Sequence, residues 1–230
     1  FRAVVRSEEN LIYDADLPLL PGYDHWYGRQ IQAVGAGKTG SLNVSLATPE
    51  AAPGAPDATL DLLLGAITTG SHHVKVYVNP AANPASVWEG NWIGATVHQV
   101  SATFPASHLN SAGNNTIKVE VINDVAGRAA DILRVDWLDI GYGRQYVAAD
   151  DRLIFGGDLT GVRRYDVAGF STPDMELYDV TDPGHPTRID WTTEIPSVLP
   201  VYLPMIGNAI SPLAAAAGAP ATVGGGAPAI

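Results

Sequence analysis

The chain contains no cysteine in its 230 residues. This absence excludes disulfides, thiolate zinc sites and a cysteine nucleophile. Without a thiol to activate, we expect no cysteine-peptidase activity under reducing conditions. The absence does not fix the cellular compartment, because many exported bacterial proteins also lack cysteine.

Basic residues are also scarce. The 13 Lys and Arg residues face 24 Asp and Glu residues, which gives a net charge of −11. We therefore expect no nucleic-acid partner and no anionic membrane surface as a partner. No apolar run approaches the ~18 residues that a membrane span requires. Because the chain starts at Phe1 rather than at methionine, we expect a secreted or cell-surface product whose signal peptide has been removed, although a cloned fragment would look the same.

Several catalytic motifs are missing as well. The sequence has no G-x-S-x-G elbow, no H-E-x-x-H, no phosphate-binding glycine loop and no EF-hand loop. A glycosidase would need two carboxylates facing each other across a cleft. The pair Asp136 and Asp139 is better explained as solvated loop acids. We therefore expect no catalytic residue and no enzyme activity in this chain.

The residues that are present indicate an all-β fold. Hydrophobic residues make up 46% of the chain, while Gly 24 and Pro 17 are spread along its length. Apolar and polar residues alternate in residues 41–48, 71–79 and 116–123, which is the period of a half-buried strand. About eight strands at a spacing of ~8–15 residues predict a jelly-roll β-sandwich.

Residues 131–146 form the strand around which we expect this sandwich to be organised. The segment is rich in β-branched and aromatic residues. Strict alternation divides it into a core face and an opposite face, with Leu133, Val135 and Trp137 on the first and Arg134, Asp136 and Leu138 on the second. Trp137 is therefore predicted to be a core anchor.

Composition predicts three regions. Residues 1–147 form the sandwich, and residues 148–195 form a small β appendage with three short strands. Residues 196–230 are a Pro/Ala/Gly-rich C-terminal tail or linker. We expect the tail to be mobile after about Ala209 in a free monomer. We also expect one terminal segment, residues 1–16 or residues 196–230, to become ordered along a neighbouring copy.

Several short patterns carry a family resemblance. They are HWY at 25–27, HHVKVYVN at 72–79, WEG at 88–90, LNSAGNNTIKVEV at 109–121, VDWLDIGYGRQY at 135–146, LIF at 153–155 and MELYDVTDPGHP at 175–186. Over residues 25–190 the chain resembles the β-rich region that precedes the catalytic domain in secreted gingipain-like cysteine peptidases. In that family the catalytic His and Cys lie in a separate downstream domain, so the resemblance implies the accessory region rather than the protease.

Loop aromatics are the candidate ligand-binding residues. Trp88 and Trp92 are expected in one loop, with Tyr23 and His25 in another. Exposed aromatic rings stack on sugar rings, so a glycan platform is one interpretation. The other is that the rings plug the ends of the sandwich, which we favour for Trp26 and leave open for Trp88 and Trp92.

Acidic pairs are the candidate metal ligands. Clustered carboxylates suit calcium, so a structural calcium site is considered at Asp150 and Asp151 or near Glu8 and Glu9, with no other cofactor expected. His72 and His73 are adjacent in a predicted strand, so their side chains point to opposite faces and cannot chelate one metal as a pair. We predict that both are surface or edge histidines.

Three functions remain open after these observations. The first is a non-catalytic extracellular accessory or structural module whose partners are other proteins or copies of itself at the cell surface. The second is a carbohydrate-binding module that uses the loop aromatics. The third is a fragment of a gingipain-like cysteine peptidase whose catalytic domain lies outside this sequence.

Overall fold

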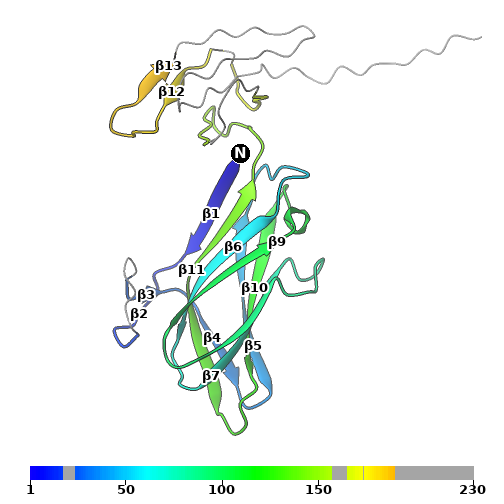
Figure 1. The fold of residues 1–230 in the computed structure, drawn as a ribbon, viewed down its shortest axis with the longest axis vertical. Coiled ribbons are helices and arrows are strands. Elements are labelled where there is room, and N and C mark those ends of the chain that lie inside the picture. Colours follow the sequence, from blue (N-terminus) through cyan, green and yellow to red (C-terminus); the bar gives the residue numbers. More distant parts are fainter. Residues whose placement is uncertain (18–23, 157–164, 173, 190–230) are drawn as a thin grey trace, which may run out of the picture. The chain divides into compact units, whose positions relative to one another are not determined.

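The computed structural model describes residues 1–17, 24–156, 165–172 and 174–189. These residues belong to two compact units, one formed by Arg2–Gln145 and the other by Phe1 together with residues from Tyr146 onward (Figure 1). The expectations for the tail, including its mobility after Ala209 and the ordering of residues 196–230 along a neighbouring copy, lie outside the described residues. The other terminal segment considered, residues 1–16, contains a strand, Arg2–Glu8, that pairs within its own chain. The domain boundaries at 147 and 195 stay predictions.

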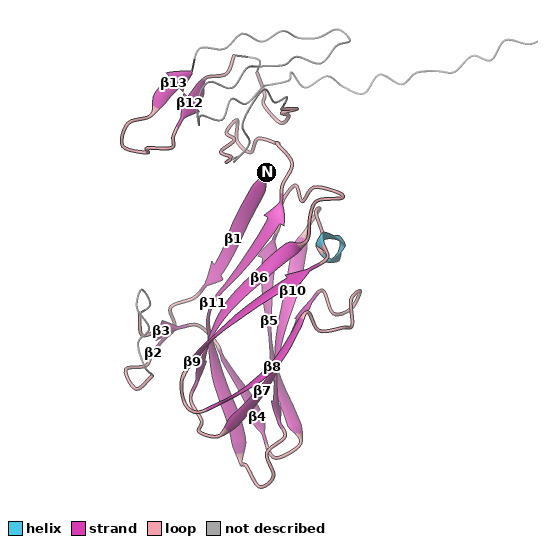
Figure 2. Cartoon of the chain, viewed as in Figure 1, coloured by secondary structure: helices cyan, strands magenta, loops and turns pink. Residues whose placement is uncertain are grey.

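Two antiparallel sheets face each other in the first unit (Figure 2). The first sheet has the order β1-β11-β6-β9, formed by β1 (Arg2–Glu8), β11 (Ala130–Gly143), β6 (Ala58–Ala66) and β9 (Val97–Phe104), and β4 (Gln30–Val34) pairs with the start of β11. The second sheet has the order β5-β10-β7-β8, formed by β5 (Lys38–Ala47), β10 (Asn114–Asn123), β7 (Ser71–Val78) and β8 (Trp88–Ile93). The all-β jelly-roll sandwich is confirmed.

The core lies between the sheets and follows the alternation of the sequence. In β7 and β10 every second residue is fully buried, namely Val74, Val76 and Val78 in the first strand and Ile117, Val119 and Val121 in the second. From β6 the same core receives Leu60, Leu62 and Leu64. Each buried aliphatic side chain of this kind contributes roughly 1.5–3 kcal/mol of hydrophobic stabilisation.

A β-bulge in β11 changes the predicted faces of the organising strand. The register of β11 against β6 shifts between Val135 and Leu138. Leu133 and Val135 therefore face the core as predicted, but Leu138 faces it too. Trp137 is buried outside this core cluster, with the guanidinium of Arg6 4.5 Å from its ring centre. Trp137 is therefore buried as predicted, but it is no anchor of the core cluster, because the bulge inserts one extra residue into the alternation.

Three local features complete the first unit. Strand β8 runs without a break up to Ile93. The chain between Trp26 and Val34 is divided into two strands at Gly28, whose amide donates to the carbonyl of Val135 over 2.8 Å. A Cβ at Gly28 would lie 3.0 Å from the carbonyl oxygen of Glu9, so a side chain is poorly tolerated at this crossing. A 3₁₀ turn, Ala106–His108, follows β9.

The second unit is a small β appendage, as predicted. Its described part contains the hairpin of β12 (Leu177–Asp179) and β13 (Thr187–Ile189). A separate aromatic cluster joins Phe1, Tyr146, Phe155 and Tyr165, with ring centres about 5–6 Å apart. This cluster gives the unit an apolar centre of its own.

Candidate functional site

A short hairpin on the outer face of the first sheet carries the candidate site. It pairs β2 (Ile12–Tyr13) with β3 (Trp26–Tyr27), so that Tyr13 lies opposite Trp26. Tyr27 is only 2% exposed and packs over Gly65 of β6, where an added Cβ would lie 2.8 Å from its ring. Because side chains alternate along a strand, seating Tyr27 on the sheet turns Tyr13 and Trp26 outward.

The two outward rings form an exposed aromatic pair. Tyr13 is 58% exposed and Trp26 is 41% exposed. Their ring centres lie 5.3 Å apart in an edge-on arrangement, and the ring of His25 lies 5.8 Å from that of Tyr13. The prediction that Trp26 plugs the sandwich is therefore wrong. We call Tyr13, His25 and Trp26 the hairpin surface.

Polar contacts fix the shape of the hairpin surface. The carboxylate of Asp24 accepts a hydrogen bond from the amide of Trp26 over 2.8 Å. The Nδ1 atom of His25 lies 3.0 Å from the carbonyl oxygen of Asp14, and the carboxylate of Asp14 forms an ion pair with Arg134 of β11. The rings are thus held in place before any ligand arrives, which reduces the entropy lost on binding.

Two carboxylates, those of Asp136 and Asp139, lie in β11, the strand that also contains Arg134. Asp136 is 5% exposed, and burial raises its pKa to about 6, with further increases from the negative charges of Glu8 and Asp24. The positive charge of Arg6 lowers the pKa of Asp136. Asp139 also lies in β11, where both of its oxygens accept hydrogen bonds from Arg6 at 2.7 Å. The prediction that Asp136 and Asp139 are loop acids is therefore wrong.

The raised pKa of Asp136 makes stability depend on pH. The folded state holds the Asp136 proton up to about pH 6, whereas the unfolded chain releases it near 3.8, so stability should fall as pH rises between these values. Asp136→Asn should be about 1–2 kcal/mol more stable than the wild type at pH 8, after allowance for solvent screening, and should gain nothing at pH 4. Denaturant melts from pH 4 to pH 8 measure this difference. A constant difference across that range would contradict the assigned pKa.

Trp88 and Trp92 lie elsewhere than the sequence suggested. Both belong to β8 rather than to a loop, are half-buried and pack against the core. Trp92 stacks on His98 of β9 with ring centres 4.3 Å apart and planes inclined by 5°, and burial lowers the pKa of His98. Of the other predicted binding residues, His25 belongs to the hairpin surface and Tyr23 lies outside the described residues.

Three of the four predicted calcium ligands, Glu8, Glu9 and Asp151, make other side-chain contacts. Glu8 pairs with Arg6, and Glu9 pairs with Arg29. Asp150 and Asp151 both have positive φ, 51° and 56°, and form a tight turn. The Asp151 carboxylate accepts hydrogen bonds from the amide and hydroxyl of Ser171, which lowers its pKa. Within the described ranges no three His, Cys, Asp or Glu residues gather as metal ligands, and structural calcium stays a prediction.

A buried ionic network was missed by the sequence analysis. His72 is fully buried, with Nδ1 2.7 Å from Asp131 and Nε2 3.2 Å from the carbonyl oxygen of Gly94. Arg128 also donates to Asp131, over 3.0 Å. The prediction of His72 as a surface or edge histidine is wrong. The signal was present in the sequence, because His72 shares the period-two face of Val74, Val76 and Val78.

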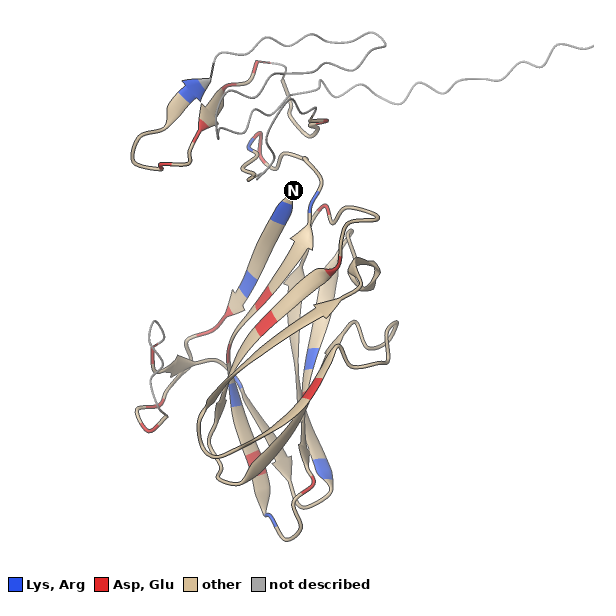
Figure 3. Cartoon of the chain, viewed as in Figure 1, with Lys and Arg blue, Asp and Glu red and all other residues tan. Residues whose placement is uncertain are grey.

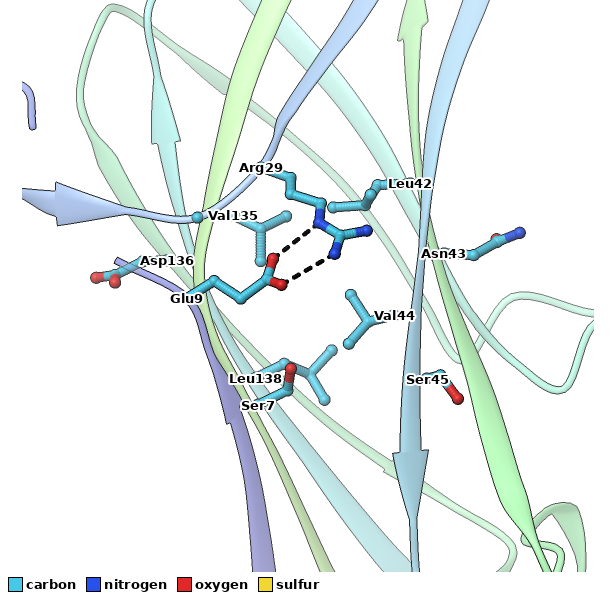
Figure 4. A pocket seen from close by; sticks show the side chains of 11 residues that line it. Ser7, Glu9, Arg29, Leu42, Asn43, Val44, Ser45, Val135, Asp136 and Leu138 are labelled. Carbon is cyan, nitrogen blue, oxygen red and sulfur yellow. Dashed lines mark hydrogen bonds and ion pairs between the residues drawn. The ribbon is translucent and has the colours of Figure 1, made fainter. Parts of the chain in front are cut away.

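A narrow cleft opens beside β5 on the side facing β1 (Figure 4). Its volume is about 220 Å³, and its apolar wall consists of Leu42, Val44, Val135 and Leu138. The ion pair between Arg29 and Glu9 lies across the cleft, whereas the carboxylate of Asp136 points away from it. The cleft therefore exposes part of the sandwich core between two edge strands.

Among comparisons with known proteins, a solved structure with a TM-score above 0.5 supports the fold. No protein-family profile and no curated protein matches the chain. Among solved structures, dimeric latent PorU from Porphyromonas gingivalis has a TM-score of 0.51 at 9% identity, covering 89% of this chain and 19% of PorU. This chain thus spans about a fifth of that protein. The xylan-binding module CBM15 has a TM-score of 0.38 at 12% identity, with 63% of this chain and 99% of the module covered. The module CBM36, in complex with calcium and xylotriose, has a TM-score of 0.32 at 12% identity, with 60% and 98% covered.

No helix of the described residues is long and apolar enough to cross a membrane.

Proposed function

We propose that the chain is a non-catalytic accessory region of a larger secreted or cell-surface protein, and that its sandwich binds carbohydrate through the hairpin surface. The observation that carries the proposal is the outward, exposed pair of Tyr13 and Trp26, on a short hairpin whose Tyr27 packs on the first sheet. Single exposed hydrophobic side chains are common, but adjacent exposed aromatic rings form a patch of the kind that marks binding sites.

The chemistry of the hairpin surface suits a sugar. The faces of aromatic rings accept the C–H groups of a pyranose ring, and carboxylates accept hydrogen bonds from its hydroxyl groups. Asp24 supplies a carboxylate on the same hairpin as Trp26. Because the edge-on pair offers two differently inclined rings, we expect recognition of a bent or branched glycan rather than a flat crystalline surface.

The proposal that this chain is an accessory region of a larger protein is supported by other observations. Residues 25–190 resemble the region upstream of the catalytic domain in gingipain-like peptidases, and the fold shared with a segment of latent PorU is compatible with that position. The net charge of −11 disfavours nucleic acid as a partner. Targeting a secreted protein to surface glycans is the function that these features support together.

Binding to a glycan array tests the proposal. The full chain should bind at least one glycan class saturably, and Trp26→Ala should weaken that binding at least about tenfold, because truncation removes the central stacking surface. Circular dichroism should show an unchanged fold, since Trp26 contributes little to the core.

The matched control is Tyr178→Ala in the β12–β13 hairpin. Tyr178 is 45% exposed, close to the value for Trp26, but belongs to the other unit. Its replacement should leave glycan binding unchanged. Equal losses in both variants, or no binding by the wild type across a broad array, would reject the hairpin surface as a glycan site.

A further inference from the structure

Within the described part of the chain, strand β5 forms an edge of the second sheet. It pairs with β10 without a break over ten residues and is the terminal strand in the sheet order. Natural edge strands are commonly protected by charges, prolines or bulges. β5 contains no proline, and its only charged residue is Lys38 at its start (Figure 3). Around Gly40 the strand lies against β4, where an added Cβ would meet the carbonyl oxygen of Gln32. Beyond that point, the backbone of Leu42–Ala47 pairs with no second strand among the described residues and can accept one.

The direction of the backbone groups follows from the neighbouring strands. The amide of Asn79 donates to the carbonyl of Thr116, so Thr116 directs its backbone groups toward β7. Successive residues of an antiparallel strand face opposite neighbours, so Ile117 faces β5, where its register partner is Val44. Hence Val44 faces β10, and the backbone groups of Asn43 and Ser45 face the open side.

The open segment is complementary to itself. If two copies pair antiparallel with Val44 at the two-fold axis, Asn43 of each copy lies opposite Ser45 of the other, and the outward backbone groups meet. No like charges meet along the segment, although each copy carries a net charge of −11.

The cleft beside β5 gives this pairing an apolar component. Leu42 and Val44 line it and are only partly buried within one copy. In the symmetric pair, Leu42 lies opposite Leu46 of the second copy and the two Val44 side chains meet at the axis. Each copy thus covers the apolar wall that the other leaves open.

We propose that a second copy of this chain docks on β5, joining the two four-stranded sheets into one continuous sheet centred on Val44. This inference is independent of the glycan proposal, because β5 and the hairpin surface share no residue. Its test is the association state of the full chain, for which sedimentation velocity between about 1 and 100 µM should show a monomer–dimer equilibrium.

A disulfide reports the register directly, because the native chain has no cysteine. In Val44→Cys the two thiols would face each other in a non-hydrogen-bonded pair, with Cα atoms about 4.5 Å apart, within reach of a disulfide. Mild oxidation should convert this variant to a covalent dimer. The control Ser41→Cys places its thiols about 20 Å apart in the same register and should stay uncrosslinked. Equal crosslinking of both variants would overturn the register.

Charge placed on the edge tests the strand itself. Asn43 and Ser45 are exposed, so the double variant Asn43→Lys/Ser45→Lys should fold normally while four lysines repel at the axis. Its dimer dissociation constant should rise at least about tenfold. The control Gln99→Lys/Thr103→Lys places the same charges on exposed positions of β9, an edge of the other sheet, and should dimerise like the wild type. A monomeric wild type, or a dimer unaffected by the β5 lysines, overturns the proposal.

Discussion

Asp131→Ala is expected to lower the free energy of unfolding by about 3–5 kcal/mol, as removal of one member of a buried ion pair does. Asp131 is fully buried and accepts hydrogen bonds from Arg128 and Thr68, each over 3.0 Å. It also lies 2.7 Å from His72 Nδ1, so truncation removes the counter-charge of the largely buried Arg128 guanidinium and the partner of this imidazole nitrogen. Urea denaturation monitored by circular dichroism measures the loss.

The adjacent histidine supplies the control. His73 lies on the opposite face of β7, and its Nδ1 is 2.8 Å from the carboxylate of Asp124, whose side chain is 50% exposed. The chemistry and distance match those of the buried pair, but solvent screens the exposed one. Asp124→Ala should therefore cost no more than about 1 kcal/mol. Similar losses in Asp131→Ala and Asp124→Ala would show that the buried network contributes nothing special.

Leu138→Ala is expected to destabilise the sandwich by about 2–5 kcal/mol, because it opens a cavity in a fully packed core. This prediction tests the bulge in β11. Without the register shift, Leu138 would lie on the outer face with Arg134 and Asp136, and its truncation would cost far less. Guanidinium melts of Leu138→Ala measure the loss.

Val4→Ala on β1 is the corresponding outer-face control. Val4 pairs with β11 at Gly141 and is 64% exposed, so its truncation should change stability by less than about 1 kcal/mol. If Leu138→Ala also lowers the free energy of unfolding by less than about 1 kcal/mol, Leu138 lies on the outer face and β11 has no bulge at this position.

The sequence alone was sufficient for the sandwich. In β5, β7 and β10 the alternation of apolar and polar residues runs without interruption, and each of these strands buries the face that its sequence predicts. Local alternation is a property of neighbouring residues, so it can be read without knowing which strands pair. The same alternation placed His72 on the buried side of β7, although its partner Asp131 is 59 residues away and only the fold brings the two together.

Tertiary structure decided the faces of β11 and the position of the aromatic residues. The bulge depends on how β11 pairs with β6, and the residue types at 135–138 do not predict it. Because of the bulge, Trp137 and Leu138 lie on the opposite faces of the sheet from those that strict alternation predicts. Likewise Trp26 and Trp88 have similar aromatic surroundings in the sequence, yet one is exposed on a hairpin and the other packs against the core. Tyr27 packs against the small Gly65 on β6, and this contact turns the neighbouring Trp26 outward. Strand β8, in contrast, is the edge strand of the second sheet, and its tryptophan rings pack against the interior of the sandwich. Both outcomes depend on contacts between segments distant in the sequence, which composition and periodicity do not encode.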